Sequence, residues 1–387
     1  MPLTARLRLF YFLYYGAVGA NLPYFAAYLR GLGFSGEQIG TVQMIGPILA
    51  VPVALGWGTL ADRLGAPGRA LGVACAGSAL FALFLPVART PLALAGVVLG
   101  QSLGERAVVP LADAATLEWA RQGAGPAYTR IRLFGSIGFV VLAQGLGLLL
   151  SARGDRPADA VVPLAIATCV VGYAFAAQRL PLAVVATAAR PHPREALALL
   201  RDPRLVTLLC ACGLHWATCA PFHLLFGVLV RDLSLPASIT GLAMAAGVGA
   251  EVLALLAYPR LARRFGTRTL FAVAFGGTAL RWALVAVARG APALVGLQLL
   301  HAVTFGLFWG ASMQALTALV PPRLRATGQS LYSAVVFGVG NAVGYQLAGA
   351  GYDRLGGVGP LFAWAAAVEV IPLLVTLGLN TMRHEPD

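Results

Sequence analysis

Long apolar runs alternate with short polar segments along the whole chain, and Arg, Pro, Gly or Asp residues bound each run. A run of about 20 apolar residues can cross a bilayer as a helix. Lipid favours helices because their backbone polar groups bond within the segment. The pattern therefore predicts an all-α membrane protein with twelve transmembrane helices. Their expected extents are 7–29, 37–61, 69–88, 91–119, 127–151, 159–178, 204–230, 237–259, 268–288, 291–319, 326–350 and 357–381.

The longest polar stretch, Arg179–Arg204, lies near the middle of the chain, with six expected helices on either side. It divides the expected fold into two six-helix bundles. We expect an N-terminal bundle over residues 1–178, a linker over 179–203 and a C-terminal bundle over 204–387.

Arginines concentrate in alternate loops. The segment between the eighth and ninth expected helices contains Arg260, Arg263 and Arg264, whereas the next loop contains Arg289 alone. Cytoplasmic loops of membrane proteins carry an excess of basic residues. Both termini and the linker share the arginine-rich side, so we expect all three in the cytoplasm.

The composition agrees with a chain whose surroundings are mostly lipid. Hydrophobic residues make up 59% of it and charged residues 11%, whereas soluble domains contain about 25% charged residues. The formal net charge of +13 comes from arginines spread over the loops rather than clustered on one face, which argues against a nucleic-acid partner. The five cysteines lie inside apolar runs, so no disulfide framework is expected.

Several ionisable residues fall at membrane depth, where a charge is costly and usually functional. They come from both expected bundles. These residues are Glu105, Arg106, Asp113, Arg132, Glu251, Arg281, His301 and Glu369.

Two of these residues can meet on neighbouring helices. Asp113 lies shortly before the fourth helix returns to the cytoplasm, and Arg132 lies shortly after the fifth leaves it. At a rise of about 1.5 Å per residue, both lie roughly 8–9 Å inside. Phe139 lies on the same face as Arg132, about two turns deeper, where its ring could cover a ligand. The alternative is a structural ion pair with Phe139 as ordinary packing.

Four segments together resemble one family. The segment Tyr128–Phe139 resembles the helix 5 motif of lactose permease and of phenylpropionate-permease-like facilitators, and Pro110–Asp113 is similar to the permease's Pro-x-x-Glu. Gly19–Leu29, and His301–Gly306 with Arg281 before it, are also similar. The chain therefore resembles proton symporters of the major facilitator superfamily over nearly its whole length. The resemblance implies two parallel six-helix repeats with a solute site at the membrane midplane between them.

The resemblance also implies roles for particular residues. In lactose permease, the residues matching Asp113 and Arg132 bind sugar hydroxyls, and a Trp matches Phe139. These three positions are therefore expected to bind substrate, although the shorter acid and smaller ring make galactoside specificity doubtful. Arg281 and His301 match residues that couple transport to protons.

The proton carrier itself is less defined. Thr304 stands where the permease has its proton-carrying Glu, and Glu251 is displaced by about one turn. The expected carrier is therefore Glu251, Glu369 or His301 itself, with Arg281 as a counter-charge. The alternative is that His301 is a neutral residue hydrogen-bonded to a neighbouring helix.

The segment Gly58–Gly65 resembles the superfamily's signature loop between helices 2 and 3, and Pro259–Gly266 partly repeats it. The resemblance implies a gate at the cytoplasmic end, formed by Gly58, Asp62, Arg63 and Gly65. The alternative is that Asp62 and Arg63 have no gating role and only follow the positive-inside rule for cytoplasmic loops.

The seventh expected helix has one further pattern, because Cys212, His215, Cys219 and His223 fall on one stripe. Soft ligands on one face could bind a transition metal, but buried Cys and His more often pack or make interhelical hydrogen bonds. We expect no metal and no cofactor. The sequence also lacks the common hydrolase, Walker and zinc motifs, so we expect no enzyme activity.

Together these features predict a monomeric secondary transporter in a bacterial inner membrane. We expect proton-coupled symport of a small organic solute by alternating access, with an aromatic carboxylate, a sugar or a nucleoside as the solute. Proton-antiport efflux is the alternative within transport. A membrane receptor or sensor that transports nothing is the alternative from another class.

Overall fold

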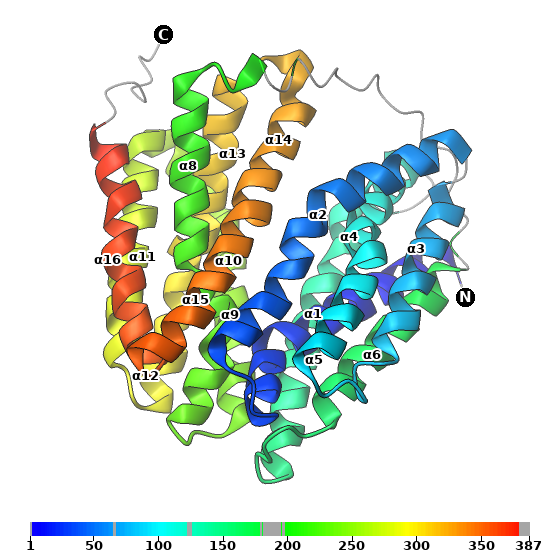
Figure 1. Cartoon of the computed structure of the whole chain (residues 1–387). Helices are drawn as coiled ribbons and strands as arrows, with labels where there is room; N and C mark the ends of the chain where they lie inside the picture. The colour runs from blue at the N-terminus through cyan, green and yellow to red at the C-terminus, as the bar shows by residue number, and fades with distance from the viewer. Residues whose placement is uncertain are drawn as a thin grey trace. The chain divides into compact units, whose positions relative to one another are not determined.

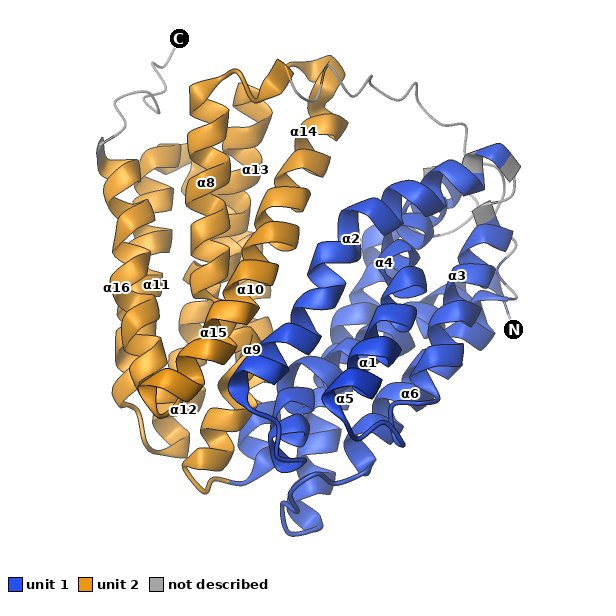
Figure 2. Cartoon of the chain, viewed as in Figure 1, with its two compact units in different colours: residues 1–189, 236–241 blue, residues 190–235, 242–387 orange. Residues whose placement is uncertain are grey.

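The computed structural model describes residues 2–64, 67–121, 126–178, 180, 195 and 198–378, and all regular structure in these ranges is helical (Figure 1). The chain divides into two compact units (Figure 2). The first comprises residues 1–189 and 236–241, and the second comprises 190–235 and 242–387. Most of the expected linker, 179–203, lies outside the described residues.

The first unit contains six helices in its described part. They are α1 (Leu3–Gly31), α2 (Gly36–Leu64), α3 (Pro67–Ala82), α4 (Pro91–Arg121), α5 (Tyr128–Ala152) and α6 (Val161–Ala177). In this unit α1 packs against both α5 and α6, and α4 packs against α2 and α3.

The second unit is built from helices that change winding along their length. Its described elements are α8 (Pro203–Thr218), α9 (Ala220–Asp232), α10 (Ala237–Arg264, whose first five residues group with the first unit), α11 (Thr267–Val287), α12 (Ala291–Gly296), the 3₁₀ turn Leu297–Leu300, the π turn Ala302–Leu307, α13 (Phe308–Leu319), the 3₁₀ turn Pro322–Leu324, α14 (Arg325–Ser333), the π turn Ala334–Gly340, α15 (Asn341–Leu355) and α16 (Val358–Gly378).

Most expected helices appear within a few residues of their predicted bounds, but several differ in length or winding. The third ends at Ala82 rather than at 88. The expected seventh helix breaks at Cys219 into α8 and α9, because Pro221 cannot donate a backbone hydrogen bond. The tenth continues from Ala291 to Leu319 but passes through the π turn Ala302–Leu307.

The described chain contains eight helical segments that are long and apolar enough to cross a membrane. They include α2, α4, α5 and the continuous pair α8–α9. The apolar helices α3 and α6 are shorter. The fold is therefore that of an all-α membrane protein.

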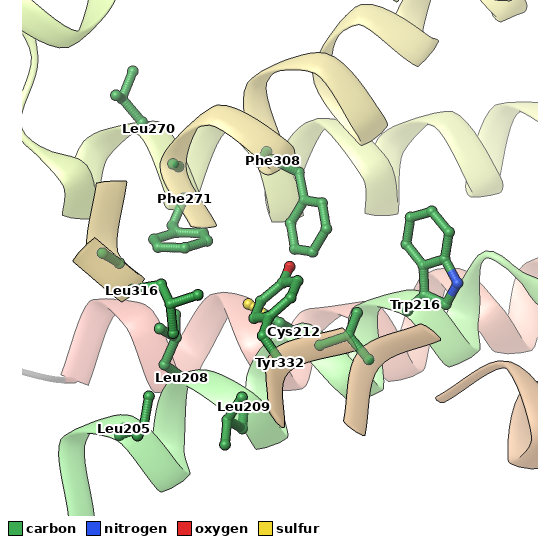
Figure 3. Packing of buried hydrophobic residues seen from close by; sticks show 14 of the residues in the cluster. Leu205, Leu208, Leu209, Cys212, Trp216, Leu270, Phe271, Phe308, Leu316 and Tyr332 are labelled. Atoms are coloured by element: carbon green, nitrogen blue, oxygen red, sulfur yellow. The ribbon is translucent and has the colours of Figure 1, made fainter. Parts of the chain in front are cut away.

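The core of the second unit joins α8 to α11 and α13. Leu208 and Cys212 of α8, Phe271 of α11, and Phe308 and Leu316 of α13 are buried in one cluster. Figure 3 shows the side chains of α8 facing those of the other two helices. Apolar burial therefore holds the three helices together near the polar groups described below.

A glycine seam brings α1 and α5 into close contact in the first unit. A β-carbon at Gly138 of α5 would lie 2.1 Å from the carbonyl oxygen of Phe12, and one at Gly19 of α1 would lie 2.4 Å from the carbonyl oxygen of Phe139. Small residues let membrane helices approach this closely. The seam sets how far the tyrosines of α1 reach toward the polar residues of α4 and α5.

Replacement of Gly138 by Ala tests the seam. The new methyl group would meet the backbone of Phe12 rather than a flexible side chain. We expect Gly138→Ala to lower the free energy of unfolding by about 1–3 kcal/mol through overpacking. The measurement is thermal or denaturant unfolding in detergent.

Gly145 on the same helix is the matched control, because a β-carbon there would meet nothing within 4 Å. Gly145→Ala should change stability little or raise it by up to about 1 kcal/mol through helix propensity. Equal effects of the two substitutions would contradict a close approach at Gly138.

Candidate functional site

In the first unit a carboxylate is held by tyrosines from two other helices. The Tyr11 hydroxyl of α1 donates to Oδ1 of Asp113 on α4 at 2.7 Å and lies 3.3 Å from Oγ1 of Thr116. Tyr128, the first residue of α5, also hydrogen-bonds Asp113. The Asp113 carboxylate is therefore fixed in place, with its side chain half-buried.

Arg132 belongs to the same cluster. Its guanidinium carbon lies 3.8 Å from the centre of the Tyr15 ring and 5.9 Å from that of Tyr11. A guanidinium over an aromatic face is attracted to the ring's negative quadrupole. Arg132 also interacts electrostatically with Asp113. The structure thus places the two residues in one cluster, with tyrosines of α1 against both.

Phe139 lies two turns further along α5, and its side chain is half-buried. Its backbone is the part that contacts Gly19 at the seam. On α1, Tyr11 and Tyr15 are the aromatic groups that contact the charged pair. Sequence reasoning missed them, although their four-residue spacing in an apolar helix places both on one face.

Glu105 and Arg106 form a separate polar group on α4. Gln101 donates to Glu105 at 3.2 Å, and the Arg106 guanidinium lies 3.9 Å from the Glu105 carboxylate. Gly46 of α2 leaves room for that guanidinium, since a β-carbon there would lie 2.6 Å from it. The Arg106 guanidinium therefore packs closely against α2 at Gly46.

In the second unit a fully buried arginine anchors a polar chain. Arg281 of α11 donates to Oε1 of Gln298 and, at 3.2 Å, to Nδ1 of His301. Its guanidinium carbon lies 4.6 Å from the ring centres of both Phe222 and Trp282. Two aromatic faces and two hydrogen bonds thus replace the water that this charge would otherwise bind.

The contact with Arg281 determines which ring nitrogen of His301 carries the hydrogen. Arginine only donates, so Nδ1 of His301 accepts and the neutral ring carries its hydrogen on Nε2. Nε2 lies 3.4 Å from Oε2 of Glu251 on α10. The structure therefore brings three of the expected proton-coupling residues into one chain, Arg281–His301–Glu251, whose charges balance when Glu251 is ionised.

Glu369, the fourth expected proton-coupling residue, lies elsewhere in the unit. Its Oε1 is 2.6 Å from Nδ1 of His215 on α8, and its Oε2 hydrogen-bonds Thr218. Nε2 of His215 lies 3.1 Å from the carbonyl oxygen of Thr304, inside the π turn. The side chains of His215 and Glu369 are fully buried.

These contacts change the interpretation of the cysteine–histidine stripe. The stripe continues across the break at Cys219, since Cys219 Sγ lies 3.9 Å from Nε2 of His215 and His223 interacts electrostatically with His215. The His215 ring, however, is held by hydrogen bonds to Glu369 and to the carbonyl oxygen of Thr304. Within the described residues, no group of three or more His, Cys, Asp or Glu side chains is arranged to hold a metal ion.

Comparisons with known proteins identify the family of this chain. The model of the MFS_1 like family matches residues 4–364. The chain belongs to the MFS_1 like family. It is therefore a transporter of the major facilitator superfamily.

Relatives within this superfamily match along nearly the whole chain. Maltose permease of Geobacillus stearothermophilus is 29% identical over 370 residues, which cover 95% of this chain and 93% of that protein. The probable 3-phenylpropionic acid transporter of Escherichia coli is 28% identical over 375 residues, or 96% of each chain. The solved structure of the nucleoside transporter NupG has a TM-score of 0.87 at 20% identity and covers 99% of this chain and 100% of its own.

The segment beginning at Gly58, which resembles the superfamily's signature loop, lies at the end of α2. The helix continues to Leu64, so Asp62 and Arg63 belong to its last turns rather than to the expected loop. Leu, Ala and Arg are good helix formers, which explains the extension. Arg63 is exposed and Gly58 half-exposed, while Gly65 and the Asp62 side chain lie outside the described residues.

Replacement of Arg281 tests the polar chain of the second unit. Arg281→Leu would leave Gln298 and His301 without their donor and Glu251 without a balancing charge. We expect a loss of about 3–5 kcal/mol in the free energy of unfolding, as for a broken buried pair. Arg260→Leu, at an exposed position on α10, should stay within about 0.5 kcal/mol of wild type. Unfolding in detergent measures both, and similar stabilities would count against the arrangement.

Proposed function

We propose that this transporter takes up a small organic solute together with protons across the inner membrane of a bacterium. The observation that carries the proposal is that each unit keeps its own cluster of ionisable side chains within the membrane-spanning helices. Such groups are costly in lipid and mark solute and ion pathways. Alternating access is the mode of transport that we propose for this monomer.

We propose twelve spans with both termini in the cytoplasm. Eight of the spans are the apolar segments described above. The other four would be α1, α3, α6 and the helical stretch 325–355. The excess of arginine in alternate loops supports this orientation.

Asp113, Arg132 and Phe139 are the substrate-binding residues in this proposal, with Tyr11 and Tyr15 as aromatic neighbours. A carboxylate accepts hydrogen bonds from hydroxyls, and a guanidinium donates to hydroxyls or to a carboxylate. Aromatic rings offer flat apolar faces to a sugar or an aromatic ring. This chemistry suits a sugar, a nucleoside or an aromatic carboxylate, and the names of the relatives include maltose, 3-phenylpropionic acid and a nucleoside.

The second unit supplies proton coupling in this proposal, through Glu251, Arg281, His301 and Glu369. Each carboxylate faces a histidine, which is the side chain whose unperturbed pKa lies nearest neutrality. Gly58, Asp62, Arg63 and Gly65 form the cytoplasmic gate that the superfamily's signature segment implies.

Exchange of labelled solute in proteoliposomes tests the substrate site. We expect wild-type protein to exchange at least one of maltose, 3-phenylpropionate and uridine. Arg132→Gln removes a charged hydrogen-bond donor worth about 1.5–3 kcal/mol. It should therefore raise the half-saturating concentration by roughly 10- to 100-fold.

Arg130→Gln is the control, because Arg130 lies two residues earlier on α5 and is exposed. It should leave the half-saturating concentration within about twofold of wild type, as surface substitutions change free energies by about 0.5 kcal/mol or less. If Arg132→Gln and Arg130→Gln behave alike, the substrate site lies elsewhere.

A further inference from the structure

The His215–Glu369 pair has a hydrogen-bond geometry that determines how many protons it holds. The Thr304 carbonyl oxygen can only accept, so Nε2 of His215, 3.1 Å away, must carry a hydrogen. On the other side of the ring, Nδ1 and Oε1 of Glu369 lie 2.6 Å apart. Two atoms at that distance need a proton between them, because two lone pairs would repel.

One exchangeable proton therefore occupies the pair. It lies either on Glu369, with a neutral His215, or on His215, with an ionised Glu369. Both arrangements satisfy both hydrogen bonds and give the pair zero net charge. A neutral pair suits a site whose two side chains are wholly inaccessible to solvent.

Removal of this proton cannot leave the geometry unchanged. The products are a neutral imidazole and a carboxylate. If the ring keeps its hydrogen on Nε2, the bare Nδ1 faces the charged Oε1. If the hydrogen moves to Nδ1 to bind the carboxylate, Nε2 loses its bond to Thr304. One of the two contacts must break in either case.

We propose that His215 and Glu369 form the proton-binding site of this transporter, and that emptying it releases His215 from the Thr304 carbonyl. This inference rests on the proposed function and deepens it by naming the site and what moves with the proton. Thr304 belongs to the π turn Ala302–Leu307. π turns are rare inside helices and often lie at functional sites. The segment continues through His301 into the Arg281 chain, so the bond to Thr304 links the proton to that chain.

The surroundings of the pair supply little competing charge. On α8, Cys212 and Cys219 are the nearest titratable neighbours, with Cys219 Sγ 3.9 Å from His215 Nε2. Helix α9 contributes His223, which interacts electrostatically with His215. The phenyl rings of Phe275 (α11) and Phe308 (α13) pack on the imidazole at 5.3 and 4.1 Å. Tyr332 of α14 contacts Cys212, and α16 contributes Glu369 itself.

The Arg281–His301–Glu251 chain has the opposite requirement. Arg281 is a permanent cation, so this chain is neutral when Glu251 has given up its proton and His301 is uncharged. Protonation of Glu251 would leave a net positive charge on a chain whose Arg281 is fully buried. The two clusters therefore differ in role. The His215–Glu369 pair is neutral when a proton is bound, whereas the Arg281–His301–Glu251 chain is neutral when Glu251 is deprotonated.

Proton flux in proteoliposomes tests this assignment. Glu369→Gln can reproduce the loaded pattern, because its amide donates to Nδ1 of His215 while its oxygen accepts from Thr218, yet it cannot release a proton. With whichever of maltose and uridine the wild type exchanges, we expect the number of protons that enter per solute molecule during downhill entry, followed by a pH dye and labelled solute, to fall at least tenfold.

Glu37→Gln, at an exposed position at the start of α2, is the control and should keep the wild-type number of protons per solute molecule. The wild-type number in Glu369→Gln would overturn the assignment while leaving the proposed transport function intact. Absence of solute exchange by the wild type would instead overturn the proposed function.

A second measurement needs neither a solute nor an active Glu369 variant. Nitrogen-15 NMR of histidine-labelled wild-type protein, assigned by the resonance lost in His215→Gln, reports which ring nitrogen holds hydrogen. We expect a protonated Nε2 at neutral pH, and loss of that proton from Nε2 as the folded protein is made alkaline. A bare Nε2 at neutral pH, or no change up to the pH of unfolding, would overturn the proposal.

Discussion

The cost of placing charge in hydrocarbon constrains every polar group inside this protein. A lone ionised side chain at membrane depth costs at least about 2.5 kcal/mol, and the described clusters avoid that cost by local compensation. Asp113 has tyrosine donors, Arg281 lies between two aromatic rings, and Glu369 faces a histidine. Compensation within each unit means that each unit can keep its charges satisfied on its own. Because these contacts depend on charge, a change in the protonation of a cluster would also change its contacts.

Backbone irregularities lie at two contacts of the His215–Glu369 pair. Helix α8 ends at Thr218, whose side-chain hydroxyl hydrogen-bonds Glu369. The π turn Ala302–Leu307 contains the carbonyl that His215 contacts. A regular helix uses each such carbonyl for its own hydrogen bonds. These irregularities lie beside the buried apolar cluster of α8, α11 and α13.

The sequence predicted the helical architecture well because apolar length and loop charge are local signals. It also singled out Arg281 and His301, whose contact spans 20 residues along the chain. It missed the partnership of His215 with Glu369, which lie 154 residues apart, because no local pattern links distant helices. It assigned Asp62 to a loop, since a resemblance to a signature segment does not fix where a helix ends. The π turn was equally invisible, because its residues have no distinctive propensity.

Coupled transport is the claim on which the roles of both units depend. Its most direct test is uptake of maltose or uridine by wild-type protein in proteoliposomes that are acidic outside, with the membrane potential clamped to zero. The account predicts that the internal concentration of at least one solute rises above the external concentration and falls back when a protonophore is added. Uptake that stops at equal concentrations with the gradient intact would contradict it.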